Sequence, residues 1–412
     1  MPETYPKLRN EIDAAPADGG SEPYFIVYDR SGVAPTRLFA SPFALLVASR
    51  LDGNTSILEI ADQLGRETGD NAFTGSEVEK IVDALDEALF IDDSRFHDFR
   101  EQADRDFRSS SVRLPGSAGS AYPESGVELA EDLDQMLADA PPPEEFIDAG
   151  EAFPRAVIVP HIDFTRGAPG YGQVYKYLST RAQPRTVIVL GTAHLPLSQR
   201  FTLCEKDFQT PLGLVRTDRE ACGRIRDALA GVCDPDIDVL AHRGEHSVEL
   251  QAVWLRHIYG ADITIVPILA GSIGEFIEDR VPDPKEAVND GAIQALTASL
   301  GEFAQRGDVM IMASADLSHI GPRFGDEREI STAFLAEVEE TDREYLSATA
   351  TNPVEGLRRL AAHGDRYHVC GSAPIFLAVR SIGKVRGKLL GYHQAPTPEM
   401  RQAVTYASMV FH

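Results

Sequence analysis

The feature that most constrains the fold of this chain is a series of short apolar runs that alternate with amphipathic segments. Runs rich in β-branched residues are typical of strands buried on both faces. Helical patterns such as 248–259 and 287–305 separate them, and this alternation predicts a largely parallel sheet flanked by helices. The strand candidates are 156–159, 186–190, 263–269, 309–312 and 405–411. We therefore expect residues 112–412 to form one α/β domain.

A different pattern occupies the first quarter of the chain. Residues 1–22 are polar and lack periodicity, so we expect a disordered tail. Residues 23–95 combine short strand candidates with three helical segments, two of which open with capping boxes at Ser56 and Ser76. This arrangement predicts a small α+β, winged-helix-like domain. Residues 96–111 are charged and polar, and we expect them to form a linker.

Charge limits the partners of both domains. The 412 residues include 64 acidic and 39 basic side chains, which gives a formal net charge of −25. Lys and Arg must neutralise phosphates in a complex with nucleic acid or an anionic membrane, so we expect neither partner. No segment resembles a signal peptide or a membrane span, which predicts a cytoplasmic protein. The four cysteines are too few and too scattered for a disulfide framework.

Chemically active side chains follow the predicted strands. His161 and His194 come just after two of them, and Asp316 and His319 come after a third. The carboxyl ends of parallel strands line one crevice, so these side chains should converge. Histidines with carboxylates and a thiol are typical of a transition-metal site, which makes His161 and His194 candidate metal ligands. The alternative is that each histidine caps a strand or bonds within the core.

Asp316, His319 and Cys370 have more than one possible role. Within the Asp316/His319 pair, one residue could ligate or orient while the other acts as general acid or base, and the alternative is a capping Asp with a solvent-facing His. Cys370 precedes an apolar helix, where a lowered pKa would favour a thiolate ligand or nucleophile. Its alternative is a buried small residue.

Four further residues are expected to line the same crevice: Asp163, Glu245, His246 and Glu249. The last three open a helix ahead of the predicted strand 263–269. Together with His242, the Glu245-His246 pair also matches the H-x-x-E-H pattern of inverted zincins, which leaves a metallopeptidase as an alternative. A glycine inside that turn lowers helix stability by about 1 kcal/mol and disfavours this alternative.

The order of these motifs resembles the Memo family, also called AmmeMemoRadiSam system protein B, which is related in fold to the LigB-like extradiol dioxygenases. The resemblance rests on Val159-Pro-His161, Val189-Leu-Gly-Thr-Ala-His194, Thr210-Pro-Leu-Gly213, Glu245-His-Ser-Val-Glu249, Ile265-Val-Pro-Ile-Leu269, Ala313-Ser-Ala-Asp-Leu-Ser-His319 and Val369-Cys-Gly371. It implies one transition metal ion, copper, iron or zinc, held by His161, His194 and Cys370. It also implies a redox or metal-assisted activity, with Asp316 and His319 as catalytic residues.

The sequence departs from the family pattern at several positions, and these departures limit which functional properties of the family are expected in this chain. The related dioxygenases hold Fe(II) by two histidines and a glutamate, whereas thiolate with imidazole suits copper or zinc better. Cys370 in place of that carboxylate therefore argues against ring cleavage. The sequence also has Asp163 and Leu195 where the family usually has glycine and histidine, so the substrate-facing wall differs.

The small domain shows a second resemblance. Residues 51–60 and 76–91 are similar to the PqqD-like winged-helix domains of peptide-modification systems. That likeness implies a protein or peptide partner for this domain and is consistent with a radical-SAM enzyme as a partner of the chain. The alternatives are a dimerisation module and, for the whole chain, a non-catalytic scaffold that binds partners on a dioxygenase-like fold.

Overall fold

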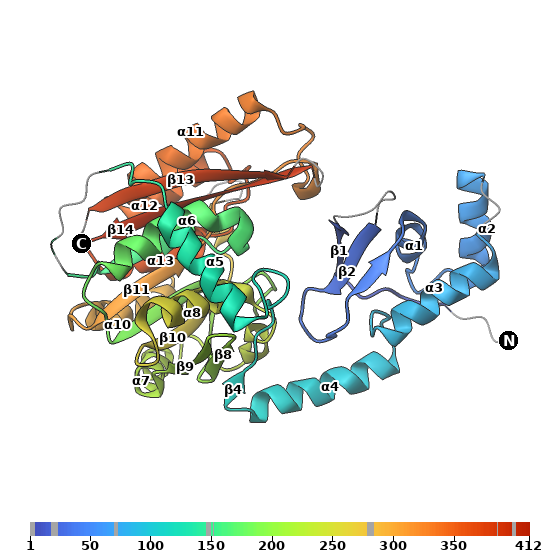
Figure 1. Ribbon diagram of the computed structural model, residues 1–412, viewed down its shortest axis with the longest axis horizontal. Coiled ribbons are helices and arrows are strands. Elements are labelled where there is room, and N and C mark those ends of the chain that lie inside the picture. The colour runs from blue at the N-terminus through green and yellow to red at the C-terminus, as the bar shows by residue number, and fades with distance from the viewer. Residues whose placement is uncertain are drawn as a thin grey trace. The chain divides into compact units, whose positions relative to one another are not determined.

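The computed structural model describes residues 5–17, 24–69, 73–145, 150, 152–277, 284–384, 386–397 and 401–412. The chain divides into two compact units, Met1–Ser109 and Ser110–His412 (Figure 1). The division falls two residues before the predicted start of the α/β domain. Among the described residues, no helix is both long and apolar enough to cross a membrane.

The N-terminal unit combines a three-stranded antiparallel sheet, in the order β1-β2-β3, with helices. Its elements are β1 (Ile12–Ala17), β2 (Tyr24–Asp29), β3 (Leu38–Ala40), α1 (Pro42–Ala48), α2 (Ile57–Thr68), α3 (Gly75–Glu87) and α4 (Ser94–Ser109). The predicted capping box of α2 is present, because Ser56 and Glu59 exchange side chain-to-backbone hydrogen bonds. Helix α3 begins earlier than predicted and is capped by Thr74.

Two expectations for this unit are wrong. The described part of the predicted disordered tail is ordered: it contains β1, and the buried Arg9 guanidinium lies 3.0 Å from the Asp29 carboxylate. Residues 1–4 and 18–22 of that tail lie outside the described residues. The predicted linker is helix α4, which buries Phe96 and Phe107. Its many charged side chains suggested a solvated linker, although two aromatic residues are enough to give it an apolar face.

In the described residues of the α/β unit, eleven strands form a mixed sheet with a parallel centre. The central order β5-β11-β6-β10-β9 is parallel throughout, whereas β14 pairs with β5 in the antiparallel sense. The strands are β4 (Val112–Arg113), β5 (Ala156–Val159), β6 (Thr186–Thr192), β7 (Phe201–Leu203), β8 (Asp207–Thr210), β9 (Gly213–Thr217), β10 (Thr264–Ala270), β11 (Val309–Ser314), β12 (His319–Ile320), β13 (Gly387–Thr397) and β14 (Gln402–Phe411). The predicted fold class is confirmed, although the run 405–411 lies in an antiparallel strand.

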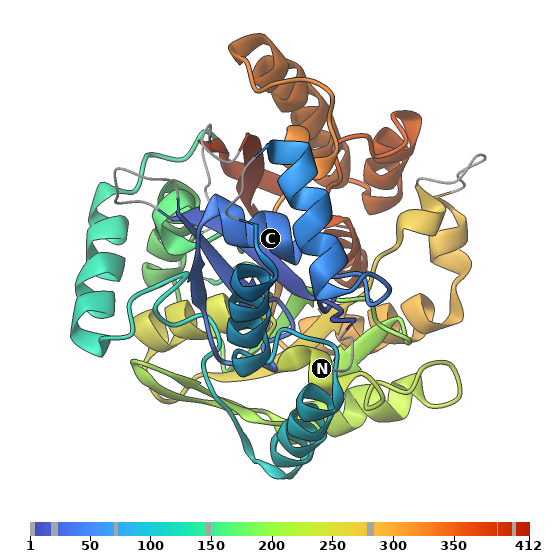
Figure 2. The same ribbon diagram turned by 90° about the vertical axis from the view of Figure 1, so that its right-hand side faces the viewer.

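Helices cover both faces of this sheet (Figure 2). They are α5 (Gly126–Asp139), α6 (Phe164–Ser179), α7 (Arg219–Leu229), α8 (His246–Tyr259), α9 (Glu286–Asn289), α10 (Gly291–Ala304), α11 (Thr332–Thr349), α12 (Pro353–Ala362) and α13 (Ser372–Ser381). Alternate residues of one strand enter opposite cores: Ile188 packs with α7, α10 and α13, whereas Val187 packs with α5, α6 and α8. Strands buried on both faces explain the continuous apolar runs of the sequence.

Candidate functional site

Three of the predicted site residues lie at equivalent places on adjacent parallel strands. His161, His194 and Asp316 each stand two residues beyond the end of β5, β6 and β11. The register pairs Ser314 with both Val159 and Gly191, so the three strands end at the same edge of the sheet. The convergence expected from the carboxyl ends of parallel strands is therefore present in the structure.

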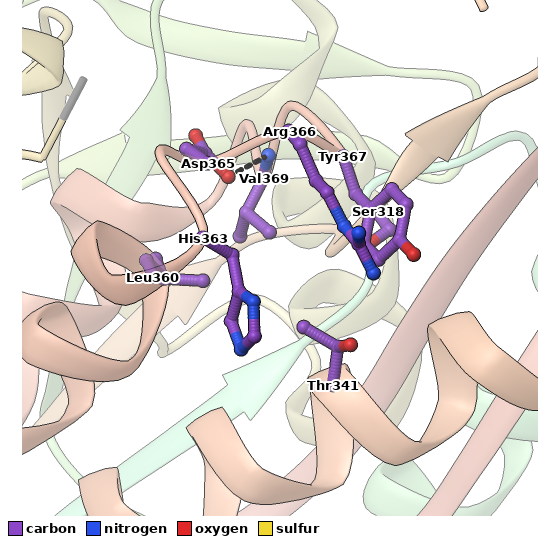
Figure 3. A pocket seen from close by; sticks show the side chains of 8 residues that line it. All are labelled: Ser318, Thr341, Leu360, His363, Asp365, Arg366, Tyr367 and Val369. Atoms are coloured by element: carbon purple, nitrogen blue, oxygen red, sulfur yellow. Dashed lines mark hydrogen bonds between the residues drawn. The ribbon is translucent and has the colours of Figure 1, made fainter.

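The fourth residue, Cys370, arrives from the loop before α13. The Asp365 carboxylate accepts a hydrogen bond of 3.0 Å from the Val369 N–H, and Figure 3 shows this contact beside a small cavity. Gly371 follows, and a Cβ at this position would clash with the carbonyl oxygen of Asp316. This close approach of backbones brings the thiol to the strand ends. The cavity contains none of the predicted metal ligands.

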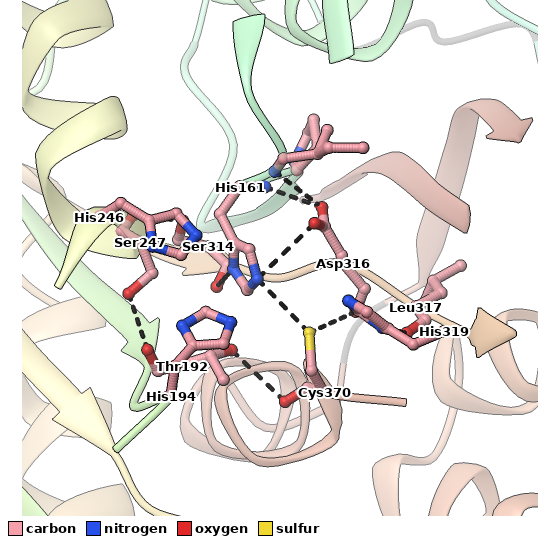
Figure 4. Close-up of polar contacts among 12 residues, drawn as sticks. His161, Thr192, His194, His246, Ser247, Ser314, Asp316, Leu317, His319 and Cys370 are labelled. Carbon is pink, nitrogen blue, oxygen red and sulfur yellow. Dashed lines mark hydrogen bonds and ion pairs between the residues drawn. The ribbon is translucent and has the colours of Figure 1, made fainter. Parts of the chain in front are cut away.

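His161, His194 and Cys370 form a compact group of donor atoms (Figure 4). The three ligand atoms lie within 4.8 Å of one another, and His161 Nε2 is 3.4 Å from Cys370 Sγ. His161 is buried, whereas about a third of the His194 side chain is exposed, so the group opens towards solvent on one side. The structure thus brings together all three predicted ligands.

In each histidine of this group, the ring nitrogen Nδ1 forms a hydrogen bond. His161 Nδ1 donates to the Ser314 carbonyl oxygen at 2.9 Å, and His194 Nδ1 donates to the Glu245 carboxylate at 3.0 Å. These bonds place a proton on both Nδ1 atoms, so Nε2 is the ring nitrogen of each histidine that can act as a ligand. Burial lowers the pKa of His161 to about 3, so its ring is neutral and available as a ligand at pH 7.

The thiol of Cys370 differs from the expectation of a lowered pKa. Burial and the neighbouring carboxylate of Asp316 raise its pKa well above the usual value. The position of Cys370 before helix α13 does not offset the rise in its pKa that burial causes. The thiol is therefore protonated at pH 7 unless a cation lies beside it.

Asp316 and His319 flank this group. The Asp316 carboxylate accepts hydrogen bonds from the His161 and Ile162 N–H groups, at 2.9 and 3.3 Å, and its other oxygen is 3.7 Å from His161 Nε2. His319 Nδ1 donates to the Leu317 carbonyl oxygen at 3.0 Å, which leaves its Nε2 as an acceptor. Burial lowers the pKa of His319 to about 4, so the ring is neutral near pH 7.

The four residues expected to line the crevice have different surroundings. Glu245 contacts His194 directly, and the His246 ring stacks on the His194 ring with centroids 4.6 Å apart. Asp163 instead caps α6 and pairs with Arg166 at 2.5 Å. Glu249 forms a buried ion pair with Arg113 and also accepts hydrogen bonds from the Gly116 and Ser117 N–H groups and from the Tyr122 hydroxyl. Its surroundings are those of a structural anchor rather than of a crevice wall.

The metallopeptidase geometry is absent. His242 belongs to a 3-10 turn, Val239–His242, and its Nε2 lies 3.1 Å from the Thr202 carbonyl oxygen. Helix α8 begins only at His246, so the two histidines of H-x-x-E-H do not share a helical face. This alternative is wrong.

A polar network that the sequence did not reveal ties α8 to the strand ends. The Gln251 amide donates to the Pro160 carbonyl oxygen at 2.8 Å and to the Ser314 hydroxyl at 2.7 Å. The Ser314 hydroxyl donates to the Ser247 carbonyl oxygen, and the Ser247 hydroxyl donates to the Thr192 carbonyl oxygen. The only available signal was a glutamine between apolar residues in the middle of helix α8. This network holds the backbone on both sides of the histidines.

Asp342 is a second residue that sequence reasoning missed. It lies on α11 and is fully buried, and it accepts hydrogen bonds from the hydroxyls of Ser318, Thr405 and Tyr392 at 2.6, 2.5 and 2.9 Å. Burial raises its pKa to about 6. Asp342 therefore braces the loop between Asp316 and His319. The sequence does contain a signal for its burial: Asp342 lies four residues after Val338, on the apolar face of the helix.

Comparisons with known proteins identify the family of the chain. The family model described as Memo-like protein matches residues 113–410. A MEMO1 family protein of Aquifex aeolicus is 27% identical over 411 aligned residues that span 95% of this chain and 97% of the relative. A MEMO1 family protein of Sulfolobus acidocaldarius is 28% identical over 283 residues, or 67% of this chain and 89% of the relative. With most of the α/β unit matched by the family model, the chain belongs to the Memo family.

Proposed function

We propose that this protein binds one transition metal ion through His161, His194 and Cys370. The observation that carries the proposal is the convergence of two imidazoles and a thiol within 4.8 Å. Both Nδ1 atoms are held by hydrogen bonds, so coordination would use the Nε2 atom of each ring together with the sulfur of Cys370. Three protein ligands and a solvent-facing side are typical of a catalytic rather than a structural metal site.

The donor set favours copper or zinc over iron, because thiolate and imidazole are softer ligands than the carboxylates and water that suit harder ions. The bound ion would supply redox or Lewis-acid chemistry. Coordination would remove the proton from the Cys370 thiol, which burial otherwise keeps protonated. Asp316 orients the His161 backbone, and His319 Nε2 could accept a proton from a substrate beside the group. We propose that the substrate is a small molecule or a peptide.

Metal analysis of purified protein tests this proposal. We expect wild-type protein to bind copper, zinc or iron stoichiometrically, and the variants His161→Ala, His194→Ala and Cys370→Ala each to lose most of that ion. Cys233→Ala is the matched control, because this buried cysteine lies away from the group and packs with α7 and α10. Unchanged metal content in the triple alanine variant would show that the assignment is wrong.

We further propose that the N-terminal unit binds a protein or peptide partner. Strand β3 forms an edge of the small sheet, and Phe39 in it is 75% exposed. An edge strand with an exposed aromatic side chain is suited to pairing with an extended peptide. Proteins that co-purify with the wild type and with His161→Ala, but not with Phe39→Asp, would support this role. Equal co-purification with all three would contradict it.

A further inference from the structure

A second group of potential ligand atoms adjoins the first. His194, Glu245 and His246 also bring one ligand atom each within 4.8 Å of the others. The group shares His194 with the proposed metal site, so two roles must be distinguished. It could hold a cation of its own, or it could support His194 as a ligand of the first group. The hydrogen bonds of Glu245 discriminate between these roles.

Both carboxylate oxygens of Glu245 are already bonded to N–H groups of the chain. Oε2 accepts from the His194 backbone N–H at 2.9 Å, and Oε1 accepts from the Ser247 backbone N–H at 2.9 Å, which caps helix α8. His194 Nδ1 lies 3.0 and 3.1 Å from the two oxygens. A carboxylate accepts only, so Nδ1 must carry the proton in this contact. A cation in the second group would have to displace that proton.

We propose that Glu245 is a positioning residue of the metal centre, which it serves by holding the Nδ1 proton of His194. This inference rests on the proposed function and deepens it. The bond fixes one tautomer, orients the ring and leaves Nε2 as the nitrogen for the metal. The Glu245 carboxylate is itself held by its contact with the His194 backbone N–H and by the cap of α8, so the partly exposed His194 is oriented by a buried side chain.

The two histidine ligands are therefore supported differently. His161 donates its Nδ1 proton to a neutral backbone carbonyl, whereas His194 donates to a buried carboxylate. A charged acceptor makes the imidazole a stronger electron donor. A Cys370 thiolate and Glu245 would together place two negative charges near the ion. Glu245 thus contributes charge as well as orientation.

Two measurements on the full-length protein test this inference. The first is nitrogen-15 NMR of the metal-free wild type, which identifies the protonated ring nitrogen of His194, and we expect it to be Nδ1. The second is zinc affinity by competition with a chromophoric chelator. We expect Glu245→Gln to bind Zn²⁺ about 10–100-fold more weakly than wild type, the usual effect of losing such a partner. Glutamine retains an oxygen that can cap α8, so the fold should survive.

Asp163→Asn is the matched control, because it neutralises a nearby helix-capping carboxylate that pairs with Arg166 rather than with a histidine ligand. Its zinc affinity should equal that of wild type. Protonation of His194 at Nε2, or equal zinc affinity in Glu245→Gln and wild type, would overturn the positioning role. Loss of zinc in His246→Ala with retention in His161→Ala would place the ion in the second group and also overturn it. A wild type that binds no ion would instead contradict the proposed function.

Discussion

Replacing Glu249 by glutamine is expected to lower the free energy of unfolding of the α/β unit by about 3–5 kcal/mol. Its ion-pair partner Arg113 is almost fully buried, and Glu249 is completely buried. A neutral amide would leave the guanidinium charge uncompensated in the interior. The carboxylate also accepts three further hydrogen bonds, from the Gly116 and Ser117 N–H groups and from the Tyr122 hydroxyl, and the amide of glutamine has only one oxygen to replace it.

Urea unfolding followed by tryptophan fluorescence measures this effect. Trp254 is the only tryptophan of the sequence and lies on the same helix, so its signal reports on the α/β unit. The double variant Arg113→Met/Glu249→Leu removes both charges, and we expect it to be more stable than Glu249→Gln. A loss below about 1 kcal/mol in Glu249→Gln, the range of an exposed pair, would contradict the anchoring role.

The second prediction concerns pH and Asp342. The folded protein raises the pKa of this carboxyl group to about 6 from 3.8, because burial disfavours its charged form. The folded state therefore binds more protons than the unfolded state between these values. Asp342 binds its proton more tightly in the folded state, and this difference stabilises the folded protein. The contribution is fully present below pH 3.8 and is lost as the pH rises through 6. Over the whole window the loss amounts to about 3 kcal/mol, at 1.36 kcal/mol per pKa unit.

Asp342→Asn isolates this contribution, since asparagine has nearly the same shape and no titrating group. The wild type should lose stability relative to the variant as the pH rises from 4.5 to 7.5, and the difference should level off above the folded-state pKa. Urea unfolding curves at several pH values, with the same fluorescence signal, give both stabilities. Parallel pH dependences of wild type and variant would show that Asp342 does not titrate in this window.

Much of the candidate site could be predicted from the sequence, because local patterns determine where a strand ends. His161, His194 and Asp316 follow apolar runs, and the rule for parallel sheets brings such positions together. Cys370 lies 54 residues beyond Asp316 along the chain, so spacing alone could not join it to them. It was assigned by its likeness to a family motif, and the structure brings it beside His161.

The contacts that support the site could not be predicted in the same way. Glu249 and Arg113 are 136 residues apart, and nothing in either local sequence indicates the other. Glu245 was expected to line a crevice, but its partner is a residue 51 positions earlier. Burial decides both roles, and burial of a charged side chain depends on tertiary packing rather than on periodicity. The same limit applies to α4, where two buried aromatic residues outweigh the polar composition.

The unequal exposure of the two histidines has a kinetic consequence. His161 is almost inaccessible, whereas a third of the His194 side chain contacts solvent. If His161, His194 and Cys370 hold a metal ion as proposed, a chelator or a metal donor would reach that ion more readily from the His194 side than from the His161 side. The bond to His194 would then break before the bond to His161 during metal exchange. The rate of exchange would then depend on the motion of the His194 ring, which is restrained by the hydrogen bond that its Nδ1 donates to Glu245.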